Sequence, residues 1–458
     1  MAQYDIAILG GGPGGYVAAI RAAQRGAKTV LIEKEALGGV CLNVGCIPTK
    51  TLLRIAQVYQ DIVDAANFGV IVNGEVKLDW PTMLSRKNKV VQQLTSGVTQ
   101  LLKANGVDVR HGYGVVQDKN TIIVDGEEIK TKNLIIATGS RPTILPIPGL
   151  QEAMDSGIAV DSTGALAFET IPERFIVVGG GVIGIEFAAL FSTLGSKVTV
   201  LEKFSILNGL DSDIQSQMRR FLKRRGVEIF ESADVQRFEG SKVFVEVGGE
   251  VREFAGDSIL ISLGRRPNID AVADLGLELD KGGIKTNAKL ETNVPGVYAI
   301  GDVNGKQMLA HTASAEGIAA VENILGGSAE IDYNKIPACV YSFPEIAVVG
   351  LTEEQAKEQG YDVQTGMFPF AANGKALAEG QTEGFVKIVA DKQYGEVLGI
   401  HIVGPNATDL IAEAANALQL ESTLYDLAET VHPHPTLSEA VMEAAHVALG
   451  QPIHVAKR

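Results

Sequence analysis

The chain has 458 residues, of which 46% are hydrophobic and 21% charged, and its formal net charge is −15. This length exceeds what one hydrophobic core supports, so we expect several domains. The acidic balance disfavours nucleic acid as a partner because a negative surface repels phosphate, and glycines and Glu186 interrupt the most apolar stretch, residues 175–191, which excludes a membrane span there.

The first predicted unit, residues 5–34, reads as strand, glycine-rich turn, helix and strand. Its turn has the pattern G-x-G-x-x-G at Gly10, Gly12 and Gly15, and Glu33 follows 21 positions after Gly12. Such glycines allow a tight turn and a close approach to a pyrophosphate, while the acid accepts the ribose hydroxyls. The unit therefore predicts a dinucleotide site. Because no signal-like or transit-like pattern precedes it, we expect a cytoplasmic protein or the mature form of an organellar one.

A close pair of cysteines follows in the segment GGVCLNVGCIPTKTLL, where Cys41 and Cys46 are separated by four residues. On an ideal helix their Cα atoms would lie about 8.6 Å apart, beyond the roughly 7 Å that a disulfide bridges. A disulfide therefore needs a distorted helix start, which Gly45 and Pro48 favour. Taken alone, the pair is also compatible with two buried thiols, but its spacing does not fit a zinc site. Lys50 lies on the same helical face as Cys46.

The unit at residues 174–203 repeats the first one. Its glycines and its acid each stand 169 positions after their counterparts, at Gly179, Gly181, Gly184 and Glu202. One glycine-rich turn is weak evidence for a ligand, but two with the acid at the same spacing favour two dinucleotide sites. The Glu202 carboxylate would repel a 2′-phosphate, so NAD is favoured over NADP. Glu186 is expected in the first turn of the helix that follows.

The segment VHPHPTLSEAVMEAA near the C-terminus contains a candidate general base, His434. A free thiol is mostly protonated at neutral pH, and histidine is the side chain suited to deprotonate it. Glu439 could orient the imidazole. Thr436 and Glu439 also fit a capping box, with Pro435 at the first helical position, which would explain Glu439 without catalysis. The residues alone leave both interpretations open. The third cysteine, Cys339, is expected to be a buried apolar residue.

Seven segments together make the chain resemble the pyridine nucleotide–disulphide oxidoreductases from Asp5 to about Ala445. They are GGVCLNVGCIPTK, IIATGSRP, GGGVIGIE, LGRRPN, VYAIGDV, PACVYSFPEIAVVG and HPHPTLSE. The resemblance implies an α/β fold with two Rossmann-like dinucleotide-binding domains, for FAD and for NAD, and a C-terminal α+β dimerisation domain. The expected bounds are 1–143 for the FAD domain, 144–266 for the NAD domain, 267–334 for a central segment returning to the FAD domain, and 335–458 for the interface domain.

The same resemblance assigns roles to individual residues. Cys41 would exchange with a dithiol substrate, Cys46 would face the flavin, and His434 with Glu439 would enter the active site of the partner subunit in a homodimer. Lys50 and Glu186 would pair beside the flavin. The residues expected at FAD are Gly10, Gly12, Gly14, Gly15, Glu33, Lys50, Thr138, Gly139 and Asp302. Those expected at NAD are Gly179, Gly181, Gly184, Glu202 and Gly264.

The reaction implied by the resemblance is the oxidation of protein-bound dihydrolipoamide through the Cys41–Cys46 disulfide and FAD, with NAD as the final acceptor. The implied partner is a lipoyl-bearing protein of a 2-oxoacid dehydrogenase complex or of the glycine cleavage system; no metal, membrane or nucleic acid is expected. Among alternatives, Glu202 disfavours a glutathione reductase, which would prefer NADPH. A mercuric reductase would carry cysteines beyond Cys339, and a soluble transhydrogenase would lack the full pair. A flavin-bound protein without catalysis is a further alternative.

Overall fold

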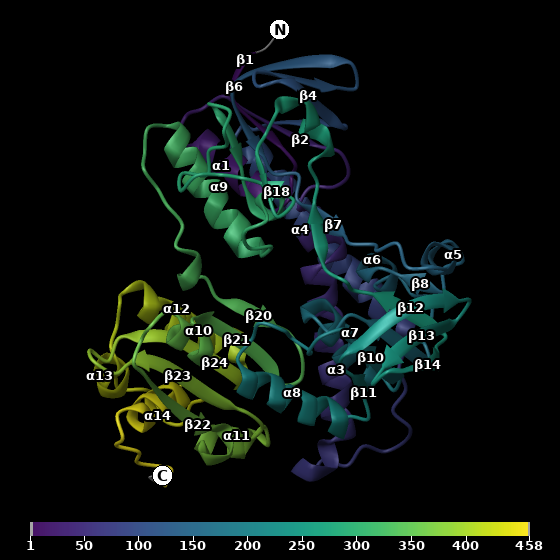
Figure 1. Cartoon of the computed structure of the whole chain (residues 1–458), viewed down its shortest axis with the longest axis vertical. Helices are drawn as coiled ribbons and strands as arrows, with labels where there is room; N and C mark the ends of the chain where they lie inside the picture. Colours follow the sequence, from purple (N-terminus) through teal and green to yellow (C-terminus); the bar gives the residue numbers. More distant parts are fainter. Residues whose placement is uncertain (1–2, 457–458) are drawn as a thin grey trace.

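The N-terminal repeat forms the centre of a largely parallel sheet in the first of three lobes (Figure 1). The computed structural model describes residues 3–456. The strands of this sheet are β1 (Gln3–Leu9), β2 (Thr29–Glu33), β3 (Asp108–His111), β4 (Gly114–Asp118), β5 (Thr121–Val124), β6 (Glu127–Ile136) and β19 (Val297–Ala299). The parallel strands run in the order β3-β2-β1-β6-β19, and β5 and β4 extend the sheet antiparallel. Apolar runs fill the central strands because helices cover the sheet.

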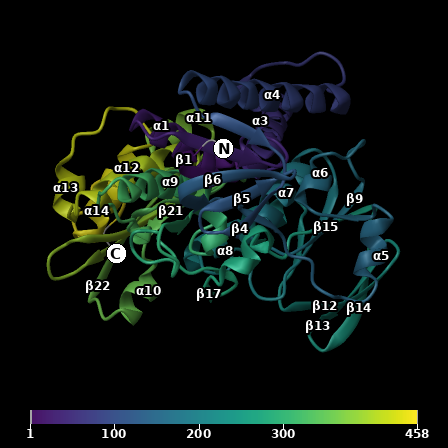
Figure 2. The same ribbon diagram turned by 90° about the horizontal axis from the view of Figure 1, so that it is seen from above.

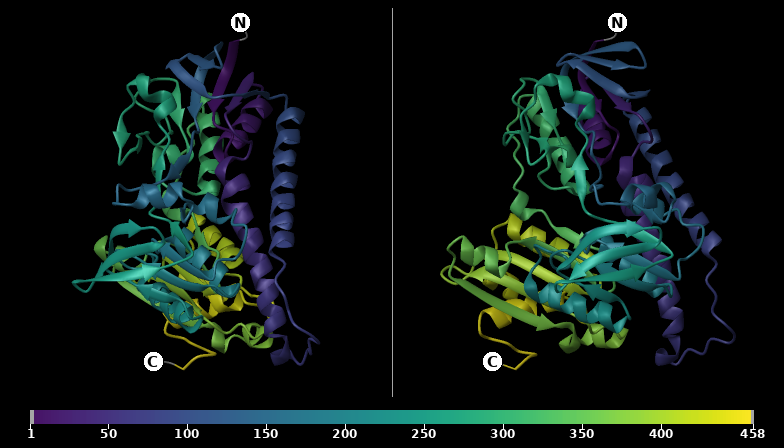
Figure 3. Two further views of the ribbon diagram at one scale, coloured as in Figure 1. Left: turned by 90° about the vertical axis from the view of Figure 1, so that its right-hand side faces the viewer. Right: turned by 45° about the vertical axis from the view of Figure 1, so that its right-hand side comes forward.

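Five helices belong to this first lobe: α1 (Pro13–Gln24), α2 (Gly39–Val44), α3 (Cys46–Val63), α4 (Trp80–Ala104) and α9 (Ala310–Ile324). A short 3-10 helix, η1 (Ala65–Phe68), follows α3. Helices α3 and α4 run side by side from the first lobe to the second (Figure 3). They are anchored there by an aromatic cluster in which the Trp80 ring lies 6.2 Å from that of Phe191. The helix that begins at Cys46 therefore rests on both lobes.

The second lobe holds the other repeat. Its parallel sheet has the strands β8 (Ala159–Val160), β9 (Arg174–Val178), β10 (Lys197–Leu201), β11 (Glu228–Phe230) and β15 (Ser258–Ile261), in the order β11-β10-β9-β15-β8. The helices are α5 (Leu150–Asp155), α6 (Ser162–Ala165), α7 (Val182–Thr193) and α8 (Ser212–Arg224). An antiparallel meander completes the lobe with β12 (Ala233–Glu239), β13 (Lys242–Val247) and β14 (Glu250–Ala255).

Two adjacent strands connect the first and second lobes. The chain leaves through β7 (Ser140–Pro142) and returns through β16 (Arg265–Pro267), which pair antiparallel. The returning segment contains η2 (Asp270–Leu275), β17 (Leu279–Asp280), β18 (Gly283–Ile284) and η3 (Gly301–Asn304) before α9. The second lobe is therefore inserted into the first. The domain bounds expected from the sequence stay a prediction, and their first two and last two residues lie outside the described residues.

The third lobe is an antiparallel sheet covered by helices. Its strands are β20 (Ala338–Val340), β21 (Glu345–Gly350), β22 (Val363–Pro369), β23 (Phe385–Asp391) and β24 (Val397–Gly404), in the order β20-β21-β24-β23-β22. The helical segments are η4 (Tyr333–Lys335), α10 (Glu353–Glu358), η5 (Phe370–Ala372), α11 (Gly374–Glu379), α12 (Ala407–Gln419), α13 (Leu424–Glu429) and α14 (Glu439–Ala448). Seen from above, this lobe and the β12–β14 meander lie at opposite ends of the molecule (Figure 2).

Across residues 3–456, none of the helices combines the length and apolar character needed to cross a membrane. Within the same residues, no cluster of three or more His, Cys, Asp or Glu side chains could hold a metal ion.

Candidate functional site

The two glycine-rich turns have nearly the same geometry. Gly10 and Gly179 have φ angles of +109° and +107°, in the region that favours glycine. A Cβ at Gly15 would lie 1.8 Å from the Gly10 carbonyl oxygen, and one at Gly184 would lie 1.9 Å from the Gly179 oxygen. These four glycines are therefore required for the helix to pack against its strand.

Gly12 and Gly181 differ from the other glycines of the turns. A Cβ at either position would meet no protein atom within 4 Å, and each residue caps the N-terminus of its helix. Packing within the protein does not require glycine at these two positions. A pyrophosphate that approaches the backbone closely would require it, so both turns fit a dinucleotide. Gly14 has a different environment, since a Cβ there would lie 3.0 Å from the Ala313 carbonyl oxygen in α9. Its position is explained by the packing of α1 on α9.

Glu33 and Glu202 occupy matching positions at the ends of β2 and β10. One oxygen of Glu33 accepts the Gly11 N–H at 2.6 Å, and one oxygen of Glu202 accepts the Gly180 N–H, also at 2.6 Å. The other oxygen accepts the N–H two positions further on, at 2.7 Å in the first lobe and 2.8 Å in the second. Each carboxylate is thus fixed beside its glycine-rich turn, where the sequence predicts that it binds a ribose.

The remaining residues expected at the cofactors follow neighbouring parallel strands, whose carboxyl ends meet at one edge of a sheet. Thr138 and Gly139 follow the end of β6 after one intervening residue, and Asp302 comes after β19, which pairs with β6. The Thr138 hydroxyl donates to the Asn268 carbonyl oxygen at 2.6 Å, and the Ser140 hydroxyl donates to Asp302. In the second lobe Gly264 follows β15, the neighbour of β9. These expected residues therefore lie at the carboxyl edges of the two parallel sheets, and their binding to the cofactors stays a prediction.

Glu316, in α9, was missed by sequence reasoning although it supports the turn that carries Asp302. It is fully buried and accepts hydrogen bonds from the Gly301 N–H, the Asn304 amide and the Tyr333 hydroxyl. Burial raises the pKa of Glu316, while these bonds partly counteract that effect. The only signal was an acid in the small and apolar part of the segment that precedes Glu322.

The cysteine segment is broken where the sequence predicts. Helix α2 ends at Val44 and α3 begins at Cys46, with Gly45 between them at φ −140° and ψ −113°. A Cβ at Gly45 would lie 2.9 Å from the Val40 carbonyl oxygen. The prediction of a distorted helix start is therefore confirmed, because the chain does not continue as one regular helix through the pair.

Cys41 and Cys46 are half-buried free thiols, and each changes the pKa of the other. The Cys46 side chain and burial raise the pKa of Cys41. The Cys41 side chain and the Lys50 ammonium favour the Cys46 thiolate and lower the pKa of Cys46 to about 7, against the effect of burial. Of the two thiols, Cys46 is therefore the one that ionises more readily near neutral pH.

Lys50 and Glu186 form the ion pair that the sequence predicts. The Lys50 ammonium donates to both Glu186 oxygens, at 2.9 and 2.8 Å, and Glu186 is only 4% exposed. Glu186 lies just beyond the first turn of α7, which begins at Val182, rather than within that turn as expected. The backbone N–H of Tyr341, in the third lobe, also donates to Glu186 at 2.9 Å. No pattern in the sequence singles out Tyr341.

His434 and Glu439 are brought together in the third lobe. The His434 Nδ1 atom lies 2.9 Å from Glu439 Oε1, and the Thr436 N–H donates to the other carboxylate oxygen at 2.8 Å. Burial tends to raise the pKa of Glu439, but the Thr436 N–H and His434 outweigh it and lower the pKa. The imidazole is 77% exposed, so it is available to another molecule.

The expected capping box around Glu439 is wrong in part. Helix α14 begins at Glu439, so Pro435 is not at its first position. The Glu439 carboxylate does reach back to the Thr436 N–H, but the Thr436 hydroxyl donates to the Pro433 carbonyl oxygen instead of capping the helix. Within residues 3–456, no hydrogen bond connects His434 with either cysteine of the pair, which lies in the first lobe.

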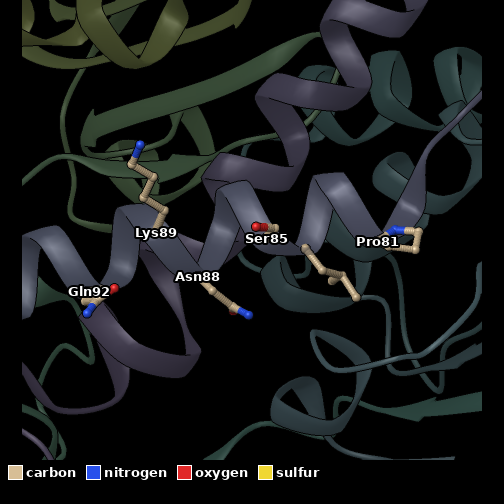
Figure 4. Close-up of a pocket in the computed structure, with 6 residues that line it drawn as sticks. Pro81, Ser85, Asn88, Lys89 and Gln92 are labelled. Atoms are coloured by element: carbon tan, nitrogen blue, oxygen red, sulfur yellow. The ribbon is translucent and has the colours of Figure 1, made fainter.

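Two further features have no role assigned in this chemistry. Cys339 is half-buried, and burial raises the pKa of its thiol to about 11, so it is a poor nucleophile. A hollow on the surface of α4 is lined by that helix alone, by Pro81, Leu84, Ser85, Asn88, Lys89 and Gln92 (Figure 4). None of the residues expected to act on substrate or cofactor lines it.

Comparisons with known proteins agree with this geometry. The family model described as pyridine nucleotide-disulphide oxidoreductase matches residues 4–317, and the model of its dimerisation domain matches residues 336–445. A dihydrolipoyl dehydrogenase of Mycoplasma genitalium is 43% identical over 98% of this chain and 99% of its own. One of Geobacillus stearothermophilus is 44% identical over 99% of this chain and 98% of its own. The solved structure of RclA, an HOCl-induced flavoprotein disulfide reductase from Escherichia coli, superposes with a TM-score of 0.85 at 29% identity, covering 97% of this chain and all of the other.

Proposed function

Because the chain belongs to the pyridine nucleotide-disulphide oxidoreductase family, we propose that it oxidises a protein-bound dihydrolipoyl group to its cyclic disulfide, with NAD as the final electron acceptor. The observation that carries the proposal is the pair of free thiols, Cys41 and Cys46, on either side of the break between α2 and α3. Such a pair can alternate between dithiol and disulfide, which the oxidation of another dithiol requires.

FAD and NAD are the cofactors. The first glycine-rich turn with Glu33 and Asp302 would hold FAD, and the second turn with Glu202 would hold NAD. The open space beside Gly12 and Gly181 fits a pyrophosphate at each turn. When bound, FAD accepts two electrons from the Cys41–Cys46 dithiol and transfers them to NAD. The protein positions these groups and favours the Cys46 thiolate.

The exchange steps follow from the two thiol environments. A thiolate of the substrate attacks Cys41 Sγ in the disulfide, forming a mixed disulfide and releasing the Cys46 thiolate. The second thiol of the substrate then attacks its own sulfur in the mixed disulfide. This step releases the cyclic disulfide and leaves Cys41 as a thiol. Two hydrogens have then moved from the substrate dithiol to the protein, and Cys46 is the sulfur best able to remain a thiolate.

His434 accepts the proton from the substrate thiol in this proposal. Glu439 fixes the imidazole through Nδ1, which leaves Nε2 free for the proton. The chain has a dimerisation domain, and the exposed imidazole belongs to it. The His434 of one subunit therefore serves the cysteine pair of the partner subunit.

The partner is a lipoyl-bearing protein of a 2-oxoacid dehydrogenase complex or of the glycine cleavage system. We also propose that the protein is located in the cytoplasm, as expected from the sequence.

The test is turnover of free dihydrolipoamide by the purified, FAD-loaded protein. We expect reduction of NAD, much weaker reduction of NADP, and loss of activity in Cys46→Ser. Fast reduction of glutathione disulfide by NADPH, without dihydrolipoamide oxidation, would overturn the proposal. Pull-down from a lysate with and without lipoylation then identifies the lipoyl-bearing partner.

A further inference from the structure

The Lys50–Glu186 pair lies where all three lobes meet. Lys50 is on α3 of the first lobe, one helical turn after Cys46, and Glu186 is on α7 of the second. Tyr341 comes directly after β20 of the third lobe and contacts both. A residue of the third lobe is therefore in a position to influence the charges beside the redox thiols.

Tyr341 makes two distinct contacts at this junction. Its backbone N–H donates to Glu186 Oε1 at 2.9 Å, and its ring lies under the Lys50 ammonium, with Nζ 4.5 Å from the ring centroid. The ring is half-buried, and burial raises the pKa of Tyr341 to about 12, so the phenol stays neutral. Within residues 3–456 its hydroxyl makes no hydrogen bond. The face of the ring, rather than the phenol oxygen, is thus the part that acts on Lys50.

The ring matters because Lys50 has a flexible side chain. Glu186 binds its ammonium on one side, but a four-carbon stem allows several ways of reaching one carboxylate. An aromatic face attracts an ammonium within about 6 Å, more strongly where water is excluded. The ring therefore restricts the ammonium to one position between α3 and β20. The groups that act on Cys46 are Cys41 on α2, Lys50 on α3 and Glu186 on α7.

We propose that Tyr341 is a positioning residue whose ring holds the Lys50 ammonium in place beside the redox thiols. Through this contact, the packing of the third lobe against the other two determines how strongly Lys50 favours the Cys46 thiolate. The inference builds on the proposed function only in taking Cys46 as the redox thiol. It requires neither a dihydrolipoyl substrate nor a particular partner.

The test measures the ionisation of Cys46 directly. The FAD-loaded protein is reduced, alkylated with iodoacetamide across a pH series, and the rate at Cys46 is followed by peptide mass spectrometry. The pH at which the alkylation rate of Cys46 is half-maximal is the midpoint of its ionisation. We expect Tyr341→Leu, which keeps apolar volume but lacks the aromatic face, to raise this midpoint by about half a pH unit. Tyr341→Phe is the matched control and should leave it unchanged. Tyr341→Met is a second non-aromatic variant in case the leucine variant does not fold.

A double-mutant cycle separates positioning from a general effect on packing. If the ring acts through Lys50, Tyr341→Leu should not change the midpoint further in a Lys50→Gln background. An unchanged midpoint in both non-aromatic variants would overturn the inference. So would an equal shift in Tyr341→Phe, or a shift that persists without Lys50. The wild-type protein could instead fail to oxidise dihydrolipoamide while the Cys46 midpoints shift as expected. That result would overturn the proposed function and leave this inference standing.

Discussion

Single residues at the carboxyl ends of the parallel strands are expected to bind the ribose of the dinucleotide in each lobe. Glu33 and Glu202 have the same backbone partners in the two lobes, so their side chains face equivalent places. The two acids differ in the cofactor they are expected to bind and not in local geometry. Each can therefore serve as the control for the other.

We expect Glu202→Ser with Phe204→Arg to lower kcat/KM for NAD about 10- to 100-fold and to raise it for NADP. Serine removes a charged acceptor of the ribose hydroxyls, and the arginine, at a position that is 64% exposed, can pair with a 2′-phosphate. Steady-state rates with each nicotinamide check this. In the control, Glu33→Ser should weaken FAD retention without changing the preference for NAD. A change of preference in the control variant would contradict the assignment of the two turns.

At the scale of elements, each glycine-rich turn contains one glycine that the packing of the fold requires and another that only a bound ligand would require. In the second lobe, a side chain at Gly184 meets the backbone of Gly179, whereas one at Gly181 meets only open space. The same substitution at these two positions should therefore have different effects.

Gly184→Ala should lower the free energy of unfolding by about 2 kcal/mol or more, because β9 and α7 must separate to admit the methyl group. Gly181→Ala should leave stability unchanged and weaken NAD binding about tenfold or more, because the backbone can no longer approach the pyrophosphate. Thermal unfolding without NAD and titration with NAD give the two quantities. Equal NAD affinity in Gly181→Ala and wild type would place the pyrophosphate elsewhere.

The sequence predicted the elements whose pattern is local. Both glycine-rich units, the break at Gly45 and the pairing of His434 with Glu439 follow from spacing over a few residues or one repeat. The start of α14 was misplaced because Thr436 bonds to Pro433 instead of capping the helix. Tyr341 and Glu316 were missed because their contacts are set by the fold: Tyr341 meets Glu186 across 155 positions. Contacts at the junction of the three lobes cannot be predicted from the spacing of residues within a short segment.

For the whole molecule, a buried cation fastens the second lobe to the third. Lys387 in β23 is 3% exposed and donates to two carboxylates at the start of α8, those of Asp211 and Asp213, at 2.9 and 2.7 Å. It also lies 3.1 Å from Glu353 in α10. Asp211 is fully buried. Burial works against the charged amine, but the surrounding carboxylates raise the pKa of Lys387.

Lys387→Met should destabilise the protein by about 3–5 kcal/mol at neutral pH, because it leaves carboxylates buried without their cation. Lys357 and Lys387 hold the pKa of Glu353 below its ordinary value of 4.5. The stability that the ionised Glu353 contributes is therefore fully present above pH 4.5. It is lost as the pH falls through the lowered pKa of Glu353. Urea unfolding of the variant and wild type should therefore show a difference that narrows in acid. The exposed pair Lys285–Glu278 provides the control, since Lys285→Met should change little.

The proposed dimer makes one further prediction, for two inactive variants mixed together. Cys46→Ser lacks the thiol and His434→Gln lacks the base, but a mixed dimer retains one intact site. Dissociating and reassociating equal amounts should recover about a quarter of wild-type activity, since half of the dimers are mixed and each has one working site of two. If both residues act within one subunit, the mixture stays inactive.

The paired strands β7 and β16 have a consequence for the order in which the chain takes shape on the ribosome. Everything needed for the parallel sheet of the second lobe is made once β15 has emerged, whereas the first lobe still lacks β19 and α9. The lobe that begins later is therefore the first to be complete, and the N-terminal strands must wait for it. Nascent chains halted with β15 outside the exit tunnel and β19 not yet made should already contain a protease-resistant second lobe beside a digestible first one.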